Sequence, residues 1–301
     1  MTKRILVCLD GSPLAESILP TIGDIGHRTG AEIVLLHVVH LPKDVPTEGR
    51  IGVDEIVAHQ EREASAYLRR LASELTADGL AARPVRAIGA AAPEIVRVAD
   101  QEQADMIALS THGRSGLQRW LYGSVADDVI HSATRPLLVL RPHAGAAPIK
   151  AVRRIVAALD GSPLAERALA PARDLAKSLG VALVLLRIVD PMPTAFATSP
   201  AGGAAFGTIL TALETEADGY LREAAARESA EGLTVEVLRR TGAPAEMIAA
   251  YGEINPDDLL VLSTHGRSGW RAALMGSVTR RVLLLSRGPI LVIPSPAPTS
   301  P

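Results

Sequence analysis

The chain has 301 residues, of which 48% are hydrophobic and 21% are charged, and its formal net charge at pH 7 is −2. A net charge this close to zero provides no overall attraction to nucleic acid, and aromatic residues, at 3%, are too scarce to form stacking platforms. The single cysteine, Cys8, excludes a disulfide framework or a thiolate metal cluster, and its apolar neighbours favour a buried, inert thiol.

Membrane segments are not predicted. No apolar run approaches the roughly 20 residues that a membrane-spanning helix needs. The N-terminal sequence MTKRILVCLD holds one brief apolar stretch, which Asp10 interrupts, so it is unlike a secretory signal. We therefore expect a cytoplasmic protein that does not associate with membranes.

Short apolar runs alternate with helical patterns through the first half of the chain. Strands are predicted at 4–9, 33–39, 84–88, 106–109 and 137–140. Helices are predicted between them at 13–29, 54–78, 93–103 and 116–133. The strand segments are apolar on both faces, which is typical of a parallel sheet covered by helices.

The second half repeats this order, with strands predicted at 154–159, 182–188, 234–238, 259–262 and 290–293. The sequence LDGSPLAE occurs at both 9–16 and 159–166, and LSTHGRSG at both 109–116 and 262–269. A repeat of this length indicates two tandem domains, 1–142 and 151–294, each a doubly wound α/β fold with a five-stranded parallel sheet. Residues 143–150 suit a linker, and we expect the tail 295–301 to be disordered. An Ala, Gly and Pro-rich stretch at 191–207 precedes the second long helix.

The turn after the first strand begins with Asp10. Gly11 permits a tight turn, Ser12 suits an N-cap and Pro13 suits the first helical position. Asp10 is either an ordinary turn aspartate or a ligand-binding residue, because ligands of open α/β sheets bind beyond the carboxyl ends of the strands. Asp160 holds the same position in the second half.

A glycine-spaced loop follows the fourth strand of each half. Gly113 and Gly123 flank nine residues, and Ser124 then begins a predicted helix. Glycines let the backbone approach an anion closely, while free amides at a helix start favour phosphate. Arg114 adds a bidentate donor. The alternative is a simple strand-to-helix loop in which Gly123 is a close packing contact.

Together, these motifs, the LLHVV run at 35–39 and the final PLLVL strand resemble the universal stress protein family in its tandem-domain form. The resemblance implies a Rossmann-like fold, similar to that of adenine nucleotide hydrolases, with ATP lying across the carboxyl edge of each sheet. It implies that Asp10 holds the ribose or the adenine and that the Val38 backbone contacts adenine.

The residues that the resemblance and the loop pattern assign to the nucleotide fall into two matching sets. In the first half they are Asp10, Val38, Leu109, Ser110, Gly113, Arg114, Gly123, Ser124 and Val125. In the second half they are Asp160, Ile188, Leu262, Ser263, Gly266, Arg267, Gly276, Ser277 and Val278.

The sequence departs from the family pattern in two ways. Ser110 and Ser263 stand where the family loop begins with glycine, and a side chain there restricts positive φ and close backbone approach. Arg187 replaces His37 in the second half, so the two sites are expected to differ in affinity or access.

The chemistry of the loops favours binding over catalysis. The four lysines of the chain, at 3, 43, 150 and 177, all lie outside both loops, so the Walker A lysine is missing. Asp127 and Asp128 lie one turn into the following helix, where a nucleotide-bound metal could meet them, and no metal site of the protein's own is predicted. We therefore expect an ATP-binding regulator, with Mg²⁺ accompanying the nucleotide and slow or absent hydrolysis.

Two alternatives remain open, a weak ATPase or adenylating enzyme and a scaffold that binds no nucleotide and acts through protein contacts. The resemblance also implies that the two domains pair through their final strands, leaving surfaces for a second chain or an unidentified protein partner.

Overall fold

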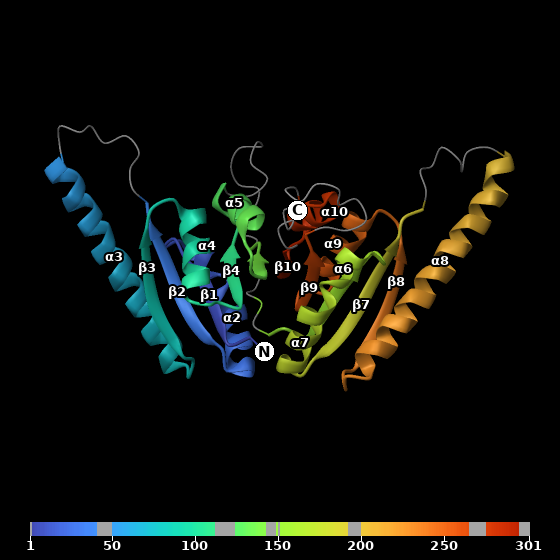
Figure 1. Cartoon of the computed structure of the whole chain (residues 1–301), viewed down its shortest axis with the longest axis horizontal. Coiled ribbons are helices and arrows are strands. Elements are labelled where there is room, and N and C mark those ends of the chain that lie inside the picture. The colour runs from blue at the N-terminus through green and yellow to red at the C-terminus, as the bar shows by residue number, and fades with distance from the viewer. Residues whose placement is uncertain are drawn as a thin grey trace, which may run out of the picture. The chain divides into compact units, whose positions relative to one another are not determined.

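A computed structural model describes residues 2–40, 50–111, 124–142, 149, 151–191, 200–264 and 275–294. The chain divides into two compact units, Met1–Ala151 and Val152–Pro301. Each unit consists of a parallel sheet flanked by helices, so the predicted α/β class is confirmed (Figure 1).

The elements of the first unit alternate along the chain. They are β1 (Arg4–Cys8), α1 (Pro13–Glu16), α2 (Leu19–Thr29), β2 (Glu32–Val39), α3 (Arg50–Ala77), β3 (Ala82–Ile88), α4 (Ala91–Gln101), β4 (Met106–Ser110), α5 (Ser124–Ser132) and β5 (Leu137–Leu140).

The second unit repeats this succession. Its elements are β6 (Arg154–Leu159), α6 (Pro163–Glu166), α7 (Leu169–Leu179), β7 (Ala182–Val189), α8 (Pro200–Ser229), β8 (Val235–Thr241), α9 (Pro244–Ile254), β9 (Asp258–Ser263), α10 (Ser277–Leu285) and β10 (Ile290–Ile293).

The strand order is β3-β2-β1-β4-β5 in the first unit and β8-β7-β6-β9-β10 in the second. Val7 of β1 lies opposite Leu35 of β2 on one side and Ala108 of β4 on the other, all in parallel. The order along the chain reverses between β1 and β4, and likewise between β6 and β9. In open α/β sheets, ligands bind at this switch point, beyond the carboxyl ends of the strands.

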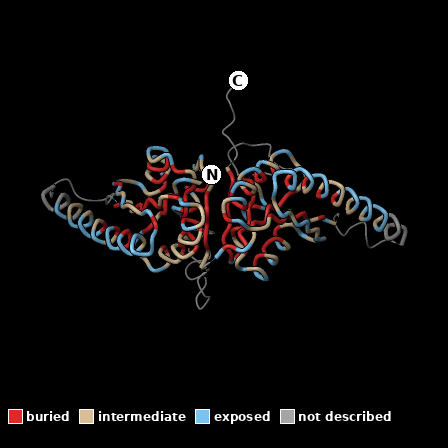
Figure 2. Tube along the Cα trace, turned by 90° about the horizontal axis from the view of Figure 1, so that it is seen from below, coloured by how far each residue is buried: buried red, intermediate tan, exposed pale blue. Residues whose placement is uncertain are grey.

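The central strands form the core of each unit. Ile5, Leu6 and Val7 of β1 are fully buried, as are Ile155 and Val156 of β6. Figure 2 shows buried residues concentrated in the sheets and exposed residues on the outward sides of the helices. Burial of both faces of these strands follows from their continuous apolar sequence.

The outer strands differ from the expectation that every strand is buried on both faces. Ala87 is the buried residue of β3, and β8 has none. Among the described residues of their units, β3 pairs with β2 alone and β8 with β7 alone. Both outer strands carry arginines, such as Arg86 and Arg239, and charged side chains are typical of an exposed sheet edge.

The first predicted helix is broken into α1 and α2, and its counterpart into α6 and α7. Pro20 has no N–H to donate to Glu16, and Pro171 has none to donate to Arg167, so neither helix continues through these positions.

The long helices α3 and α8 pack along β3 and β8 (Figure 1). α3 begins at Arg50, earlier than predicted, and buries Ala64, Leu68 and Leu71 at helical spacing. α8 begins at Pro200, so part of the stretch 191–207 is helical and was wrongly separated from the helix. Pro200 tolerates this position because the first helical residue needs no N–H bond.

Candidate functional site

The turn after the first strand of each unit begins next to the switch point. Gly11 has φ of 85° and Gly161 has φ of 80°, the left-handed region that glycine favours. Ser12 and Ser162 are N-caps whose hydroxyls accept the amides of Ala15 and Ala165. The predicted cap is therefore confirmed in both units.

Asp10 and Asp160 stabilise the corresponding turns of the two units. Asp10 Oδ1 accepts the Ser12 amide at 2.9 Å and the Ser12 hydroxyl at 2.6 Å. Asp160 Oδ1 accepts the Ser162 amide, also at 2.9 Å. Both aspartates therefore have the structural role of a turn aspartate, and the position of Asp160 at a pocket is compatible with ligand contact as well.

The start of α10 lies beside the carboxyl end of β9. Gly276 is its N-cap, and the Gly276 amide donates to Thr264 O at 2.7 Å, so this amide is already occupied. The next amides, of Ser277, Val278 and Thr279, are those that an α-helix leaves without an intrahelical partner. Because the N-cap, Gly276, has no side chain to bond these amides, the helix start can accept an anion from the pocket.

Ser110 and Ser263 end the strands β4 and β9 rather than begin a loop. Neither residue has positive φ, so the expected restriction on positive φ does not apply at these positions, while the expected limit on close backbone approach stays a prediction. Ser110 Oγ lies 3.1 Å from Ser17 Oγ, and Ser263 O accepts the Thr279 hydroxyl at 2.7 Å. The Ser263 contact ties the end of β9 to the first turn of α10.

A pocket of about 330 Å³ lies at the carboxyl edge of the second sheet. It is formed by the ends of β6, β7 and β9, the start of α10, and parts of α8 and α9. Its lining brings together the described members of the predicted set, namely Asp160, Ile188, Leu262, Ser263, Gly276, Ser277 and Val278. Pockets of this size suit small organic ligands.

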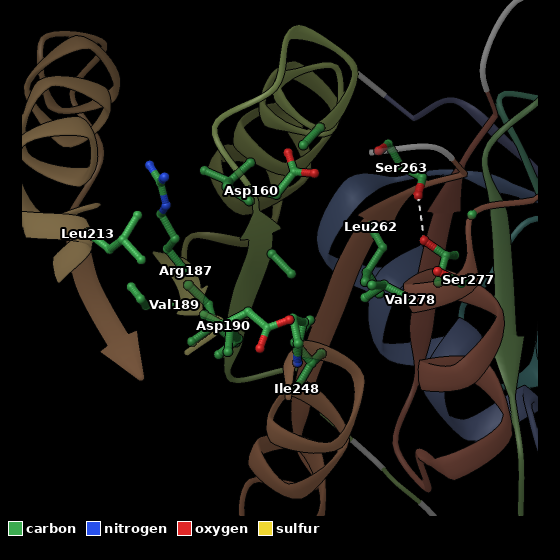
Figure 3. Close-up of a pocket in the computed structure, with 18 of the residues that line it drawn as sticks. Asp160, Arg187, Val189, Asp190, Leu213, Ile248, Leu262, Ser263, Ser277 and Val278 are labelled. Atoms are coloured by element: carbon green, nitrogen blue, oxygen red, sulfur yellow. Dashed lines mark hydrogen bonds between the residues drawn. The ribbon is translucent and has the colours of Figure 1, made fainter. Parts of the chain in front are cut away.

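Figure 3 shows that the two ends of this pocket differ. In this view Arg187 and Leu213 lie on one side, Ser277 and Val278 on the other, and Asp160 between them. Leu213 and Ile248 also line the pocket, and sequence reasoning missed them. In the sequence, these two residues are distinguished only as apolar residues on predicted helices. Core residues have the same property, so it does not indicate a pocket.

Arg187 is the buried cation of this pocket, with 5% of its side chain exposed. Its Nη2 donates to both carboxylate oxygens of Glu216, at 3.0 and 3.1 Å, while Cζ lies 4.9 Å from the ring centroid of Tyr220. Nη1 is buried and has no hydrogen-bond partner among the described residues. Cation–π contact and an ion pair thus hold the guanidinium in place, with one donor group unused.

His37 occupies the matching position in the first unit. Its ring meets Tyr67 edge to face, with centroids 6.1 Å apart. Burial lowers the pKa of His37 below its usual 6.5, although nearby Asp10 opposes the shift. The imidazole is therefore neutral at pH 7, and the two units differ by one positive charge at this place.

The other predicted residues of the first unit lie on corresponding elements. Val38 is in β2, Leu109 is in β4, and Ser124 and Val125 begin α5. Val125 is 40% exposed and its counterpart Val278 is 36% exposed, which leaves both helix starts open. Gly113, Arg114, Gly123, Gly266 and Arg267 lie outside the described residues, as does most of the expected linker and tail.

Other candidate groups have limited chemistry. Burial raises the pKa of the Cys8 thiol to about 12, so the reactive thiolate is scarce at neutral pH. Within the described ranges, no cluster of His, Cys, Asp or Glu is arranged to hold a metal ion. The helices in these ranges also include none that is long and apolar enough to cross a membrane.

Known proteins and their family model match almost the entire chain. The model of the universal stress protein family matches residues 1–141 and 151–294. Universal stress protein MJ0531 of Methanocaldococcus jannaschii is 32% identical over 142 residues, covering 46% of this chain and 82% of that protein. Universal stress protein Rv2005c of Mycobacterium tuberculosis is 28% identical over 202 residues, covering 66% of this chain and 64% of the relative.

A crystal structure of a universal stress protein from Archaeoglobus fulgidus shares the fold over the full length. It covers 97% of this chain and 98% of its own, with a TM-score of 0.71 and 23% identity. At this identity the likeness establishes the tandem fold and leaves the ligand to be argued from the site.

Proposed function

Because the chain belongs to the universal stress protein family, we propose that it is a stress-response regulator that binds an adenine nucleotide at the carboxyl edge of each sheet. ATP with Mg²⁺ is the expected ligand. Slow or absent hydrolysis makes the protein a nucleotide-dependent regulator rather than an enzyme. The pairing of the units and their association with a second chain or another protein stay predictions.

The observation that carries this proposal is the pocket between Asp160 and the start of α10. Its apolar side chains, including Ile188 and Ile248, provide a surface for a base, and Asp160 provides an acceptor for hydroxyl groups. The amides of Ser277 and Val278, together with the partial positive charge of the helix start, favour phosphate. This arrangement follows the general rule for ligands at a topological switch point.

The described part of the site lacks the lysine of efficient phosphoryl transfer. The only lysine of the second unit, Lys177, lies in α7 and pairs with Glu231 at 3.0 Å. No cation of the P-loop type therefore stands at the described start of α10 to neutralise developing charge on the β and γ phosphates.

Calorimetric titration of the full, nucleotide-stripped chain with ATP and magnesium tests the proposal. We expect two sites and thermal stabilisation, since a ligand at 100 times its Kd adds about 2.7 kcal/mol per site. Absence of both heat and stabilisation would contradict nucleotide binding and favour the scaffold. Multiple-turnover release of ADP or AMP well above background would favour the enzyme alternative.

Matched variants at the helix starts assign each site. Val278→Asp places a carboxylate where phosphate is expected, yet an acidic residue in the first helical turn favours the helix. We expect loss of the second-unit site in Val278→Asp and its retention in the neutral control Val278→Asn. Val125→Asp and Val125→Asn provide the same comparison for the first unit. Equal ATP binding by the Asp and Asn variants would refute phosphate at these helix starts.

A further inference from the structure

Arg187 is a buried guanidinium of which one donor atom, Nη1, makes no hydrogen bond within the described residues. Nη2 carries both bonds to Glu216, while Nη1 is buried without a hydrogen-bond partner among the described residues. A buried donor left unpaired is destabilising, so such groups in folded proteins generally call for an explanation. One explanation is a ligand that supplies the missing acceptor.

The position of Arg187 indicates which part of a ligand would do so. It lies near the carboxyl end of β7, the second strand of its unit, and lines the pocket together with Asp160. Its Nη1 lies beside the turn that follows Asp160, because a Cβ added at Gly161 would be only 3.0 Å from this atom. The phosphate-favouring start of α10 lies at the other side of the pocket (Figure 3).

A nucleotide with its 5′ phosphates at α10 directs its ribose toward Asp160 and Arg187. In dinucleotide-binding Rossmann folds, an acidic residue about 20 residues after the glycine-rich turn binds the ribose 2′-hydroxyl of NAD, whereas an arginine nearby accommodates the 2′-phosphate of NADP. Guanidinium groups bind phosphate bidentately, with a fixed planar geometry. The first unit lacks this cation because His37 is neutral there.

Glu216 does not prevent such a ligand from binding. Its side chain is 56% exposed, whereas that of Arg187 is 5% exposed. The carboxylate keeps much of its hydration and can leave the ion pair, while Tyr220 continues to hold the guanidinium from its face. Glu216 is thus a competitor for the same cation.

We propose that Arg187 makes the second-unit pocket selective for an adenine nucleotide that carries a phosphate on its ribose in addition to its 5′ phosphate. This inference rests on the proposed nucleotide site and concerns which nucleotide the second unit selects. The first unit, with His37, has no such selectivity.

The test compares ligands with the same number of phosphates. ADP and the adenosine 2′,5′- and 3′,5′-bisphosphates each carry two, so a difference in affinity reports phosphate position rather than phosphate count. Titrations of the full chain are expected to show at least one bisphosphate binding the second unit about tenfold more tightly than ADP, equivalent to about 1.4 kcal/mol. Val278→Asp identifies the second-unit site by its loss.

Variants separate the guanidinium from its surroundings. Arg187→His introduces the first-unit residue and is expected to abolish the bisphosphate preference while ADP binding persists. Glu216→Gln removes the competing charge from an exposed position and is expected to tighten bisphosphate binding about threefold, in the range of one exposed ion pair. His37→Ala, the matched change in the first unit, is expected to leave the preference unchanged.

The outcomes distinguish this inference from the proposed function. Equal wild-type affinities for ADP and both bisphosphates would overturn the selectivity while nucleotide binding stands. Survival of the preference in a folded Arg187→His variant would overturn the role of the guanidinium. Failure of every adenine nucleotide to bind either unit would instead contradict the proposed function itself.

Discussion

The Arg187 guanidinium lies over the ring of Tyr220, with Cζ 4.9 Å from the ring centroid. In the first unit, Tyr67 occupies the corresponding helix position and meets His37 edge to face. The duplicated domains therefore have the same tyrosine but different partners on the second strand. A fixed cation replaces a neutral imidazole without a change in the surrounding fold.

The first prediction concerns the ring that supports Arg187. Tyr220→Leu removes the cation–π contact and part of the packing of α8, and should lower the free energy of unfolding of the second unit by about 2 kcal/mol. Tyr220→Phe keeps the aromatic face and should remain within about 1 kcal/mol of wild type. Urea denaturation measures both values, and equal losses in the two variants would show that the cation–π contact is unimportant.

The second prediction uses the matched glycines of the turns. Gly11→Ala and Gly161→Ala both place a side chain at positive φ, at a cost of about 1–2 kcal/mol. An added Cβ at Gly11 meets nothing within 4 Å, whereas at Gly161 it would lie 3.0 Å from Arg187 Nη1. Gly161→Ala should therefore be the more destabilising change and should also weaken ligand binding in its unit. Equal stability losses in thermal melts would contradict the close approach of Arg187.

The third prediction is a pH dependence. The pKa of His37 in the folded unit lies below its usual 6.5, mainly through burial, so the unfolded chain binds more protons between these two values. Stability attributable to neutral His37 is complete above about pH 6.5 and is lost as the pH falls below that value. Denaturation at pH 7.5 and 5.5 should show a smaller acid-induced loss in His37→Gln than in wild type. An identical loss would refute a depressed pKa.

The fourth prediction concerns a buried carboxylate at the opposite edge of the second sheet. Asp258, with 4% of its side chain exposed, accepts Tyr251 Oη at 2.7 Å and lies 2.8 Å from Arg154 Nη2. Asp258→Ala should lower the free energy of unfolding by about 3 kcal/mol, because it leaves the Tyr251 hydroxyl without its acceptor and removes the buried carboxylate that pairs with Arg154.

The control for Asp258 is Glu236, another partner of Arg154. Its side chain is 51% exposed and lies 3.4 Å from Arg154 Nη1. Glu236→Gln should cost less than about 0.5 kcal/mol, since exposed ion pairs contribute little. Chemical denaturation of both variants measures the contrast, and comparable losses would indicate that burial of Asp258 does not strengthen its contacts.

Local chemistry made the turns predictable. The sequence Asp-Gly-Ser-Pro contains the residue for positive φ, the N-cap and the first helical residue within one short segment, and both copies fold as expected. The break between α1 and α2 was missed although Pro20 stood in the sequence. In a sequence, a proline can either lie in the first turn of a helix or end the helix before it. The two cases are distinguished only when the structure shows which backbone carbonyl lacks its N–H partner.

The availability of the loop amides was not predictable in this way. The Gly276 amide donates to Thr264, a bond across the loop that no spacing of residues reveals. Ser263 proved to be the last residue of a strand, where extended backbone suits serine as well as glycine. The backbone conformation at this strand end therefore does not require glycine.

The sequence by itself determined the duplicated α/β architecture, the order of strands and helices, and the turns that begin each unit, because periodicity and capping act over a few neighbouring residues. Only the tertiary structure decided that Arg187 of β7 meets Glu216 and Tyr220 of α8 and lines one pocket with Asp160 and Ser277. These residues come from separate elements, and their contacts depend on strand order and helix packing, which long-range burial of apolar surface establishes.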